Sequence, residues 1–237
     1  MGVRTVGGVN GQDAYREWAP GADLAPRVAC LWSRRSGRAG SVRIVPDGCI
    51  DVIWGPDGPF VAGPDTVAHL SVLRPGDEFF GIRFRPGALG GVLGVPAHAL
   101  RDLRVPLDEL PVPRGVTRER LIDAVAARLR ETARPDPARA AIVRSLCRGG
   151  SVAGVARDLG ISERQLHRRC VTAFGYGAKT LQRVMRFRRA LRLSRSGVRL
   201  ADVAVAAGYA DQAHLANDVR RLAGVPLTEL IDSSLPR

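Results

Sequence analysis

Two copies of one helical pattern lie about 48 residues apart in the second half of this 237-residue chain. In each copy a valine and an alanine precede a glycine, and a leucine follows within a second predicted helix. Small residues let two helices approach closely, and glycine allows a sharp turn between them. The pattern therefore predicts two helix–turn–helix units. The matched pairs are Val155 and Val203, Ala156 and Ala204, Gly160 and Gly208, and Leu166 and Leu215.

Start signals for the second helix of each unit support this prediction. Ser162 and Asp211 are favoured N-cap residues, and Ser162 with Gln165 forms an S-x-x-Q capping box. The segment 179–195 between the two copies has apolar residues at helical spacing. A helix of that length spans roughly 25 Å at about 1.5 Å per residue. It could hold two recognition helices near one turn of DNA apart, which is about 34 Å.

The basic charge is concentrated in the same half of the chain. Residues 1–137 carry 18 arginines against 16 acidic residues, a net of +2. Residues 138–237 carry 17 arginines and Lys179 against 7 acidic residues, a net of +11. Such an excess points to a polyanionic partner, and nucleic acid is the partner that helix–turn–helix units favour.

The second half resembles the AraC/XylS family of bacterial transcription regulators over about residues 140–231. The resemblance is carried by GISERQLHRRC, FGYGAKTLQRVMRFRRAL and LADVAVAAGYADQAHLANDVRRLAGVPLTEL. It implies an all-α domain in which two helix–turn–helix units, joined by a linker helix, bind double-stranded DNA in adjacent major grooves. It also implies a cytoplasmic, nucleoid-associated bacterial protein, a monomer or homodimer, with RNA polymerase as a further partner.

The resemblance also implies roles for individual residues. Arginine can read guanine bidentately and Asn or Gln can read adenine, whereas alanine offers only methyl contacts. Asp218 is expected to place a negative charge near the DNA, so we expect the second unit to be the weaker reader. Cys170 and Val219 stand where the family usually has a large aromatic residue, which predicts lighter packing. The implied base-reading residues are Arg164, His167 and Arg168 in the first unit and Gln212, Ala213, Ala216 and Asn217 in the second. The implied phosphate contacts are Arg169, Lys179, Arg188 and Arg221.

The first half has a different texture, that of short strands. Apolar or alternating runs are separated by turns that combine Pro, Asp and Gly, such as 46–48, 56–58 and 74–77. This spacing favours a small β-barrel or sandwich, so the whole chain is expected to be α+β with two domains. The predicted strands are 28–32, 42–45, 49–54, 60–63, 67–73 and 79–84.

A proline-rich break at 134–137 sets the expected domain boundary. The first domain, 1–135, is expected to contain a short helix at 87–94, a loop at 106–116 and a final helix at 118–131. The DNA-binding domain is expected to cover 138–237. The stretches VPDGCIDVIW and FGIRFRPGALGGVLGV resemble a compact β-rich domain found on some regulators, which implies sensing of a small-molecule effector or self-association.

Enzymatic chemistry is not indicated. Cysteine, histidine and acidic residues, including His69, lie in the first half without the spacing of a metal or catalytic motif. We therefore expect no catalysis, no metal and no cofactor. No apolar run approaches about 18 residues, and the N-terminus has no apolar signal segment, so no membrane contact is expected. Two alternatives stay open: a non-specific architectural DNA-binding protein, and a redox-sensing regulator that uses Cys30 and Cys49.

Overall fold

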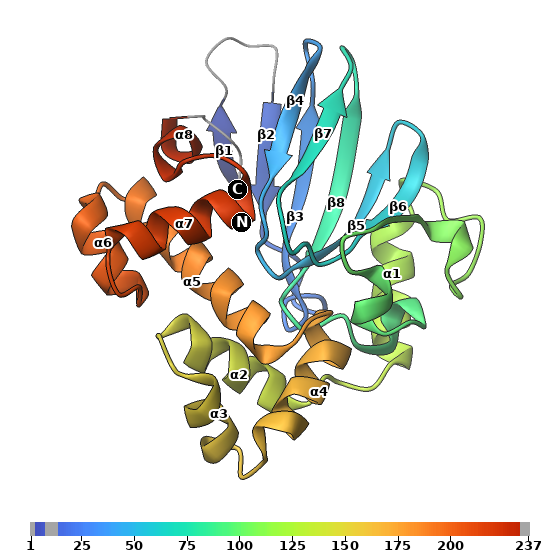
Figure 1. Cartoon of the computed structure of the whole chain (residues 1–237). Coiled ribbons are helices and arrows are strands. Elements are labelled where there is room, and N and C mark those ends of the chain that lie inside the picture. The colour runs from blue at the N-terminus through green and yellow to red at the C-terminus, as the bar shows by residue number, and fades with distance from the viewer. Residues whose placement is uncertain (1–2, 8–13, 233–237) are drawn as a thin grey trace.

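The computed structural model describes residues 3–7 and 14–232, and it places a β-rich part beside a helical part (Figure 1). Within the described residues the strands are antiparallel and form a seven-stranded sheet, β1-β2-β3-β8-β5-β6-β9, and a two-stranded sheet, β4-β7. The strands are β1 (Val3–Gly7), β2 (Ala14–Trp18), β3 (Val28–Arg35), β4 (Gly40–Ile44), β5 (Ile50–Gly55), β6 (Gly58–Ala62), β7 (His69–Leu73), β8 (Glu78–Phe84) and β9 (Arg104–Pro106).

The centre of the large sheet is held by apolar residues in register. Leu31 of β3 and Val52 of β5 both pair with Ile82 of β8, so three buried side chains form a row across neighbouring strands. Helix α1 (Leu121–Glu131) adds Leu121 and Val125 to the same core. This β-rich part confirms the fold class predicted for the first half.

The six predicted strands are present, and the glycines of the three predicted turns, Gly48, Gly58 and Gly76, have positive φ angles. Strands β1, β2 and β9 were not predicted, because they are short and carry mixed polar residues. The expected helix at 87–94 is a 3₁₀ turn, η1 (Gly90–Leu93), and η2 (Ala97–Leu100) and η3 (Leu107–Glu109) are further 3₁₀ turns. Helix α1 begins at Leu121 rather than at 118, since residues 118–120 form turns instead.

The helical part has a core of its own. Helix α5 crosses its middle, where Leu181, Val184 and Phe187 are fully buried. The helices are α2 (Pro137–Cys147), α3 (Val152–Asp158), α4 (Glu163–Phe174), α5 (Ala178–Arg195), α6 (Leu200–Ala207), α7 (Gln212–Ala223) and α8 (Leu227–Asp232). In the part of the chain that the structure describes, no helix is long and apolar enough to cross a membrane.

The predicted domain boundary, between residues 135 and 138, stays a prediction, and the packing of the two flanking helices is compatible with it. Helix α1 packs with the sheet, whereas α2 packs in the helical core. Helix α2 has a clean start, because the carboxylate of Asp136 accepts a hydrogen bond of 2.9 Å from the backbone N–H of Ala138.

The β-rich domain contacts the C-terminal ends of both α4 and α7. At α7, the guanidinium of Arg43 donates to the carbonyl of Ala223 at 2.9 Å, and the N–H of Ala68 donates to Leu222 at 2.7 Å. At α4, Gly175 lies so close to Pro64 and Ala97 that an added Cβ would clash. In Figure 1 helix α5 runs between these two contact points, beside the sheet.

Candidate DNA interface

Helices α3 and α4 form the first helix–turn–helix unit. Gly160 turns the chain between them with a φ of 63°, a left-handed conformation that suits glycine. The predicted capping box is present: the backbone N–H of Gln165 donates to Ser162 Oγ at 3.2 Å, and that of Ser162 donates to Gln165 Oε1 at 2.8 Å. Because Leu166 is completely buried, the opposite side of α4 is directed outward.

Helices α6 and α7 repeat this arrangement. Gly208 turns the chain with a φ of 86°, and Asp211 caps α7 by accepting a hydrogen bond of 2.7 Å from the N–H of His214. Leu215 lies in the core, as its counterpart does in the first unit. The internal repeat in the sequence is therefore a repeat in the structure.

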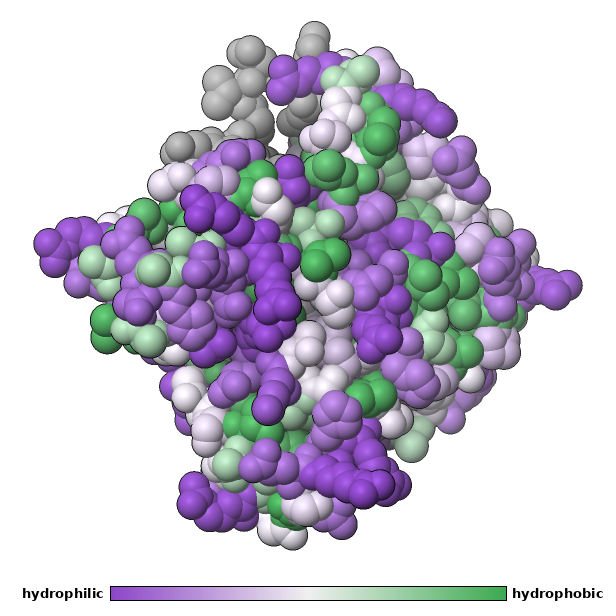
Figure 2. Space-filling view, in the orientation of Figure 1, coloured by the Kyte–Doolittle hydropathy of each residue, from purple (hydrophilic) through white to green (hydrophobic). Residues whose placement is uncertain are grey.

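The residues expected to read bases lie on the outer sides of α4 and α7. Arg164, His167 and Arg168 are exposed on α4. On α7, Gln212, Ala213 and Asn217 are exposed, and Ala216 is half-buried. Figure 2 shows strongly hydrophilic groups at the lower end of the molecule, over α3 and α4. The structure thus keeps these side chains accessible, and their base-reading role remains a prediction.

Contacts with the core explain two further features of these helices. Cys170 and Val219, which stand where the family usually has a large aromatic residue, are both fully buried. His167 packs its ring over the backbone of Gly177, at which an added Cβ would lie 2.3 Å from the imidazole. That contact orients a side chain that is otherwise exposed, and the sequence pattern did not indicate it.

Asp218 does not lie at the DNA-facing surface, and the expectation that it repels phosphate there is wrong. Its side chain is buried and forms ion pairs with Arg183 at 3.5 Å and Arg186 at 3.4 Å, both from α5. The carboxylate therefore offsets part of the positive charge of the linker helix. Burial first, and then the negative charge of Asp218, raise the pKa of the neighbouring Tyr209, whose ring lies 5.0 Å from the guanidinium of Arg186.

Of the four expected phosphate contacts, the structure places three on the surface and one elsewhere. Arg169, Lys179 and Arg221 are exposed. Arg188 instead lines a cavity between the two domains, near Asp47 and Cys49 of the β-rich domain. The reason is its position on the side of α5 that faces the sheet, which charge and spacing alone could not reveal.

Two family models match the chain, each over one part. Residues 16–106 match a domain of unknown function, DUF6597, and residues 155–233 match a model described as a helix-turn-helix domain. The second match covers both units described above.

Residues 155–233 are an AraC-type helix-turn-helix domain. The family resemblance predicted from the sequence is thereby confirmed for these residues. The AraC-type domain makes the chain a DNA-binding transcription regulator in broad class.

The solved structures that match this chain are distant from it in sequence. The C-terminal domain of AraT, a response regulator from Geobacillus stearothermophilus, is 20% identical, with 43% of this chain and 85% of that chain covered and a TM-score of 0.38. ToxT from Vibrio cholerae is 9% identical, with 84% of this chain and 99% of that chain covered and a TM-score of 0.47. ToxT from Vibrio cholerae bound to (E)-4-(8-methylnaphthalen-1-yl)but-3-enoic acid is also 9% identical, with 86% of this chain and 98% of that chain covered and a TM-score of 0.47. No curated protein matches the chain.

The cavity that Arg188 lines has a volume of about 840 Å³ and lies between the sheet and α5. In its lining, Arg83 of β8 donates to both carboxylate oxygens of Asp51, at 3.1 Å each, and lies 3.8 Å from Glu17. Burial alone would lower the pKa of Arg83, but the carboxylates of Asp51 and Asp47 raise it. Aromatic side chains such as Trp32 and Phe60 line the same space. The AraC-type domain thus shares with the β-rich domain a cavity of ligand size.

The two cysteines of the redox alternative lie in this cavity too. Burial raises the pKa of the Cys30 thiol to about 12 and that of Cys49 well above its ordinary value. A thiol that stays protonated is a poor nucleophile, so the surroundings of both cysteines oppose redox reactivity. In the described residues, no group of three or more His, Cys, Asp or Glu side chains is placed to hold a metal ion.

Proposed function

We propose that the chain is a sequence-specific transcription regulator whose helices α4 and α7 enter adjacent major grooves. The observation that carries the proposal is the pair of capped helices, each buried along one side and each presenting the expected base-reading residues on the other. Accurate placement of two helices has no purpose in a binder that reads only charge. The phosphate contacts we propose are Arg169, Lys179 and Arg221.

We propose unequal readout by the two units. The first offers Arg164, His167 and Arg168, which can hydrogen-bond to base edges, and a bidentate arginine–guanine pair discriminates by about 1–3 kcal/mol. The second offers Gln212 and Asn217 together with two alanines. A methyl contact from alanine discriminates less, because it makes no hydrogen bond that a wrong base would leave unpaired. The expected binding site has one sharply specified half containing guanine and one degenerate half about 10 bp away.

Selection of bound fragments from genomic DNA with the purified full-length protein tests this function. We expect one enriched motif with unequal halves. Arg168→Ala should lower affinity by about 1–3 kcal/mol and relax preference at one position. Arg130→Ala, which removes an exposed arginine of α1, is the matched control and should leave preference intact. Two equally sharp halves would contradict the proposed inequality.

Salt dependence separates this function from architectural binding. Neutralisation of about 5–8 phosphates predicts a slope of log affinity against log salt of roughly −4 to −7. We expect that slope together with a persistent preference for the selected site over random DNA. A steep slope with no preference would favour the non-specific architectural protein instead.

A small-molecule effector is the second part of the proposal, and the cavity between the domains supports it. Its lining combines aromatic side chains with the partly buried Arg83–Asp51 pair, so the ligand we expect is partly apolar with a polar group. A thermal-shift screen tests this, because a ligand at 100 times its dissociation constant adds about 2.7 kcal/mol of stability. Trp32→Ala should abolish the shift of a true cavity ligand, whereas an equal shift in both proteins places the ligand elsewhere.

A further inference from the structure

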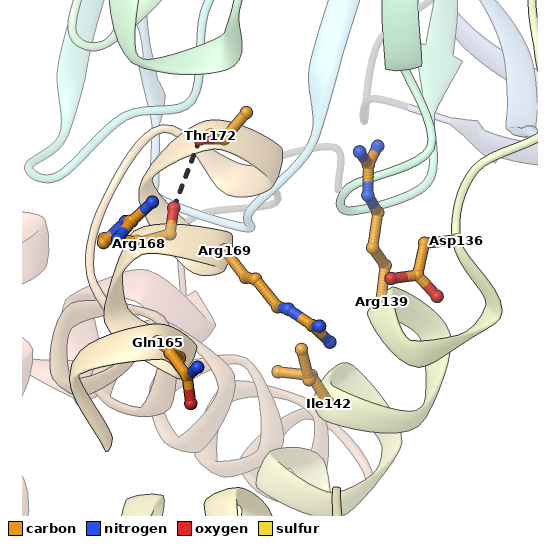
Figure 3. A pocket seen from close by; sticks show the side chains of 7 residues that line it. All are labelled: Asp136, Arg139, Ile142, Gln165, Arg168, Arg169 and Thr172. Atoms are coloured by element: carbon orange, nitrogen blue, oxygen red, sulfur yellow. Dashed lines mark hydrogen bonds between the residues drawn. The ribbon is translucent and has the colours of Figure 1, made fainter. Parts of the chain in front are cut away.

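A second, smaller pocket lies between α2 and α4, next to the proposed recognition face (Figure 3). Its volume is about 420 Å³. Arg139 comes from the first turn of α2, and Arg168 and Arg169 come from the middle of α4. In Figure 3 the side chain of Arg169 extends from α4 toward α2, over Ile142. Arg139 has no role in the function proposed above.

The charges around this pocket are not balanced. Among the described residues, Arg139, Arg168 and Arg169 form no ion pair with any carboxylate. The acidic side chain of the lining, Asp136, is already engaged as the cap of α2. The formal charge of the lining is therefore +2.

Arg27 adds further positive charge near Arg139. The buried guanidinium of Arg27 donates hydrogen bonds to the carbonyls of Ala88 and Leu89 and to the hydroxyl of Thr132. Burial, and then the nearby charge of Arg139, lower the pKa of Arg27. Three arginines that line one pocket without an acidic partner of their own favour an anion there.

Gln165 and Arg139 have donors left for a ligand, whereas Ile142 is apolar and the hydroxyl of Thr172 donates to the carbonyl of Arg168 at 3.2 Å. Gln165 uses its Oε1 in the cap of α4, so its amide nitrogen is the atom left for a ligand. Arg139 donates one bond of 3.1 Å to the carbonyl of Gly87 in the β-rich domain, which leaves most of its N–H groups for a ligand. Several donors around one concave space suit the oxygens of a phosphate group better than a flat apolar molecule.

We propose that the pocket between α2 and α4 binds a phosphate group through Arg139 and Arg169. The proposal rests on the proposed function for one source of that group, a backbone phosphate of the bound DNA beside the first recognition helix. The other source with the same chemistry is a free phosphate or small phosphate ester. Since Arg139 also contacts Gly87, the bound phosphate would lie against the contact between the two domains.

The test uses the full-length protein and the variants Arg139→Ala, Arg169→Ala and Arg130→Ala. In the described residues no hydrogen bond or ion pair joins the side chain of Arg169 to the β-rich domain. Arg169→Ala therefore keeps the test valid if Arg139→Ala disturbs folding, which circular dichroism would reveal. For a DNA source, each pocket variant should reduce the steepness of the salt slope by about 1 and weaken all sequences equally, relative to Arg130→Ala. Replacing one backbone phosphate by a neutral methylphosphonate should then weaken binding to the wild-type protein but not to Arg169→Ala.

For a free source, inorganic phosphate at constant ionic strength should raise the melting temperature of the wild-type protein and not that of Arg139→Ala or Arg169→Ala. The DNA salt slopes of these variants should then equal that of Arg130→Ala. The proposal is overturned if both pocket variants match Arg130→Ala in slope and respond to inorganic phosphate as the wild type does. If the wild-type protein prefers no DNA sequence, the proposed function fails. The salt slopes on random DNA and the response of the melting temperature to inorganic phosphate still show whether the pocket binds a phosphate group.

Discussion

Asp218 and Asn217 are adjacent on α7, but one is an anchor of the core and the other a surface group. Asp218→Ala would leave Arg183 and Arg186 without their carboxylate. The two arginines are partly exposed, at 33% and 21%, so solvent reduces the cost, and we expect a loss of about 1–3 kcal/mol in the free energy of unfolding. Asn217→Ala should change it by less than about 0.5 kcal/mol. Urea unfolding measures both, and equal losses would contradict the assignment.

The thiol of Cys30 gives a second prediction at this scale. With a pKa of about 12, its thiolate is on the order of 10⁻⁵ of the population at pH 7. The raised pKa means that reactivity increases only as the pH approaches that value. We expect slow modification of Cys30 and buried Cys49 by a thiol reagent in the native protein and rapid modification in urea. A reversible disulfide between them at neutral pH would revive the redox alternative.

At the scale of elements, the start of α4 depends on one side chain. Ser162→Ala removes the Oγ that accepts a hydrogen bond from the N–H of Gln165 and donates one to Gln165 Oε1, which should cost about 1 kcal/mol of stability. The bond from the backbone N–H of Ser162 to Gln165 Oε1 does not depend on the side chain of Ser162. Ser162→Asp restores an N-cap acceptor and is the matched control, expected to recover most of that loss. Thermal unfolding followed by circular dichroism measures the difference. No loss in the alanine variant would mean that tertiary packing alone sets the start of α4.

The elements also show how far sequence reasoning reaches. The repeat, the capping box, the β-turns and six strands follow from local patterns, because caps, turn glycines and apolar periodicity act over a few residues. Strands β1, β2 and β9 do not follow from local patterns, since each becomes a strand only by pairing with another segment of the sheet. The candidate interface divides in the same way. The exposed side of α4 could be predicted, whereas the destinations of Arg188, Asp218 and Arg139 depend on which neighbouring element packs against them.

For the whole molecule, separate cores predict separable domains. The core of the helical part consists of residues from α2 to α8, with Val45 as a partly buried addition from the other domain. We expect residues 138–237 expressed alone to fold and to bind the selected duplex. Residues 1–137 should show no binding above that of a neutral control protein. A folded 138–237 fragment that binds no better than 1–137 would contradict the division of labour.

The β-rich domain touches the ends of α4 and α7, so it spans the two helices as a brace. They cannot change their mutual angle without moving against Arg43, Ala68 and the backbone near Ala97. One base pair inserted between the two halves of a binding site adds about 3.4 Å and turns the second half by about 35°. The loss of affinity caused by that insertion therefore measures how rigidly the β-rich domain holds α4 and α7 at a fixed angle. This loss of affinity should be smaller in Arg43→Ala, which removes one of the bonds between the domains, so a DNA duplex can report how stiffly the β-rich domain holds the two helices.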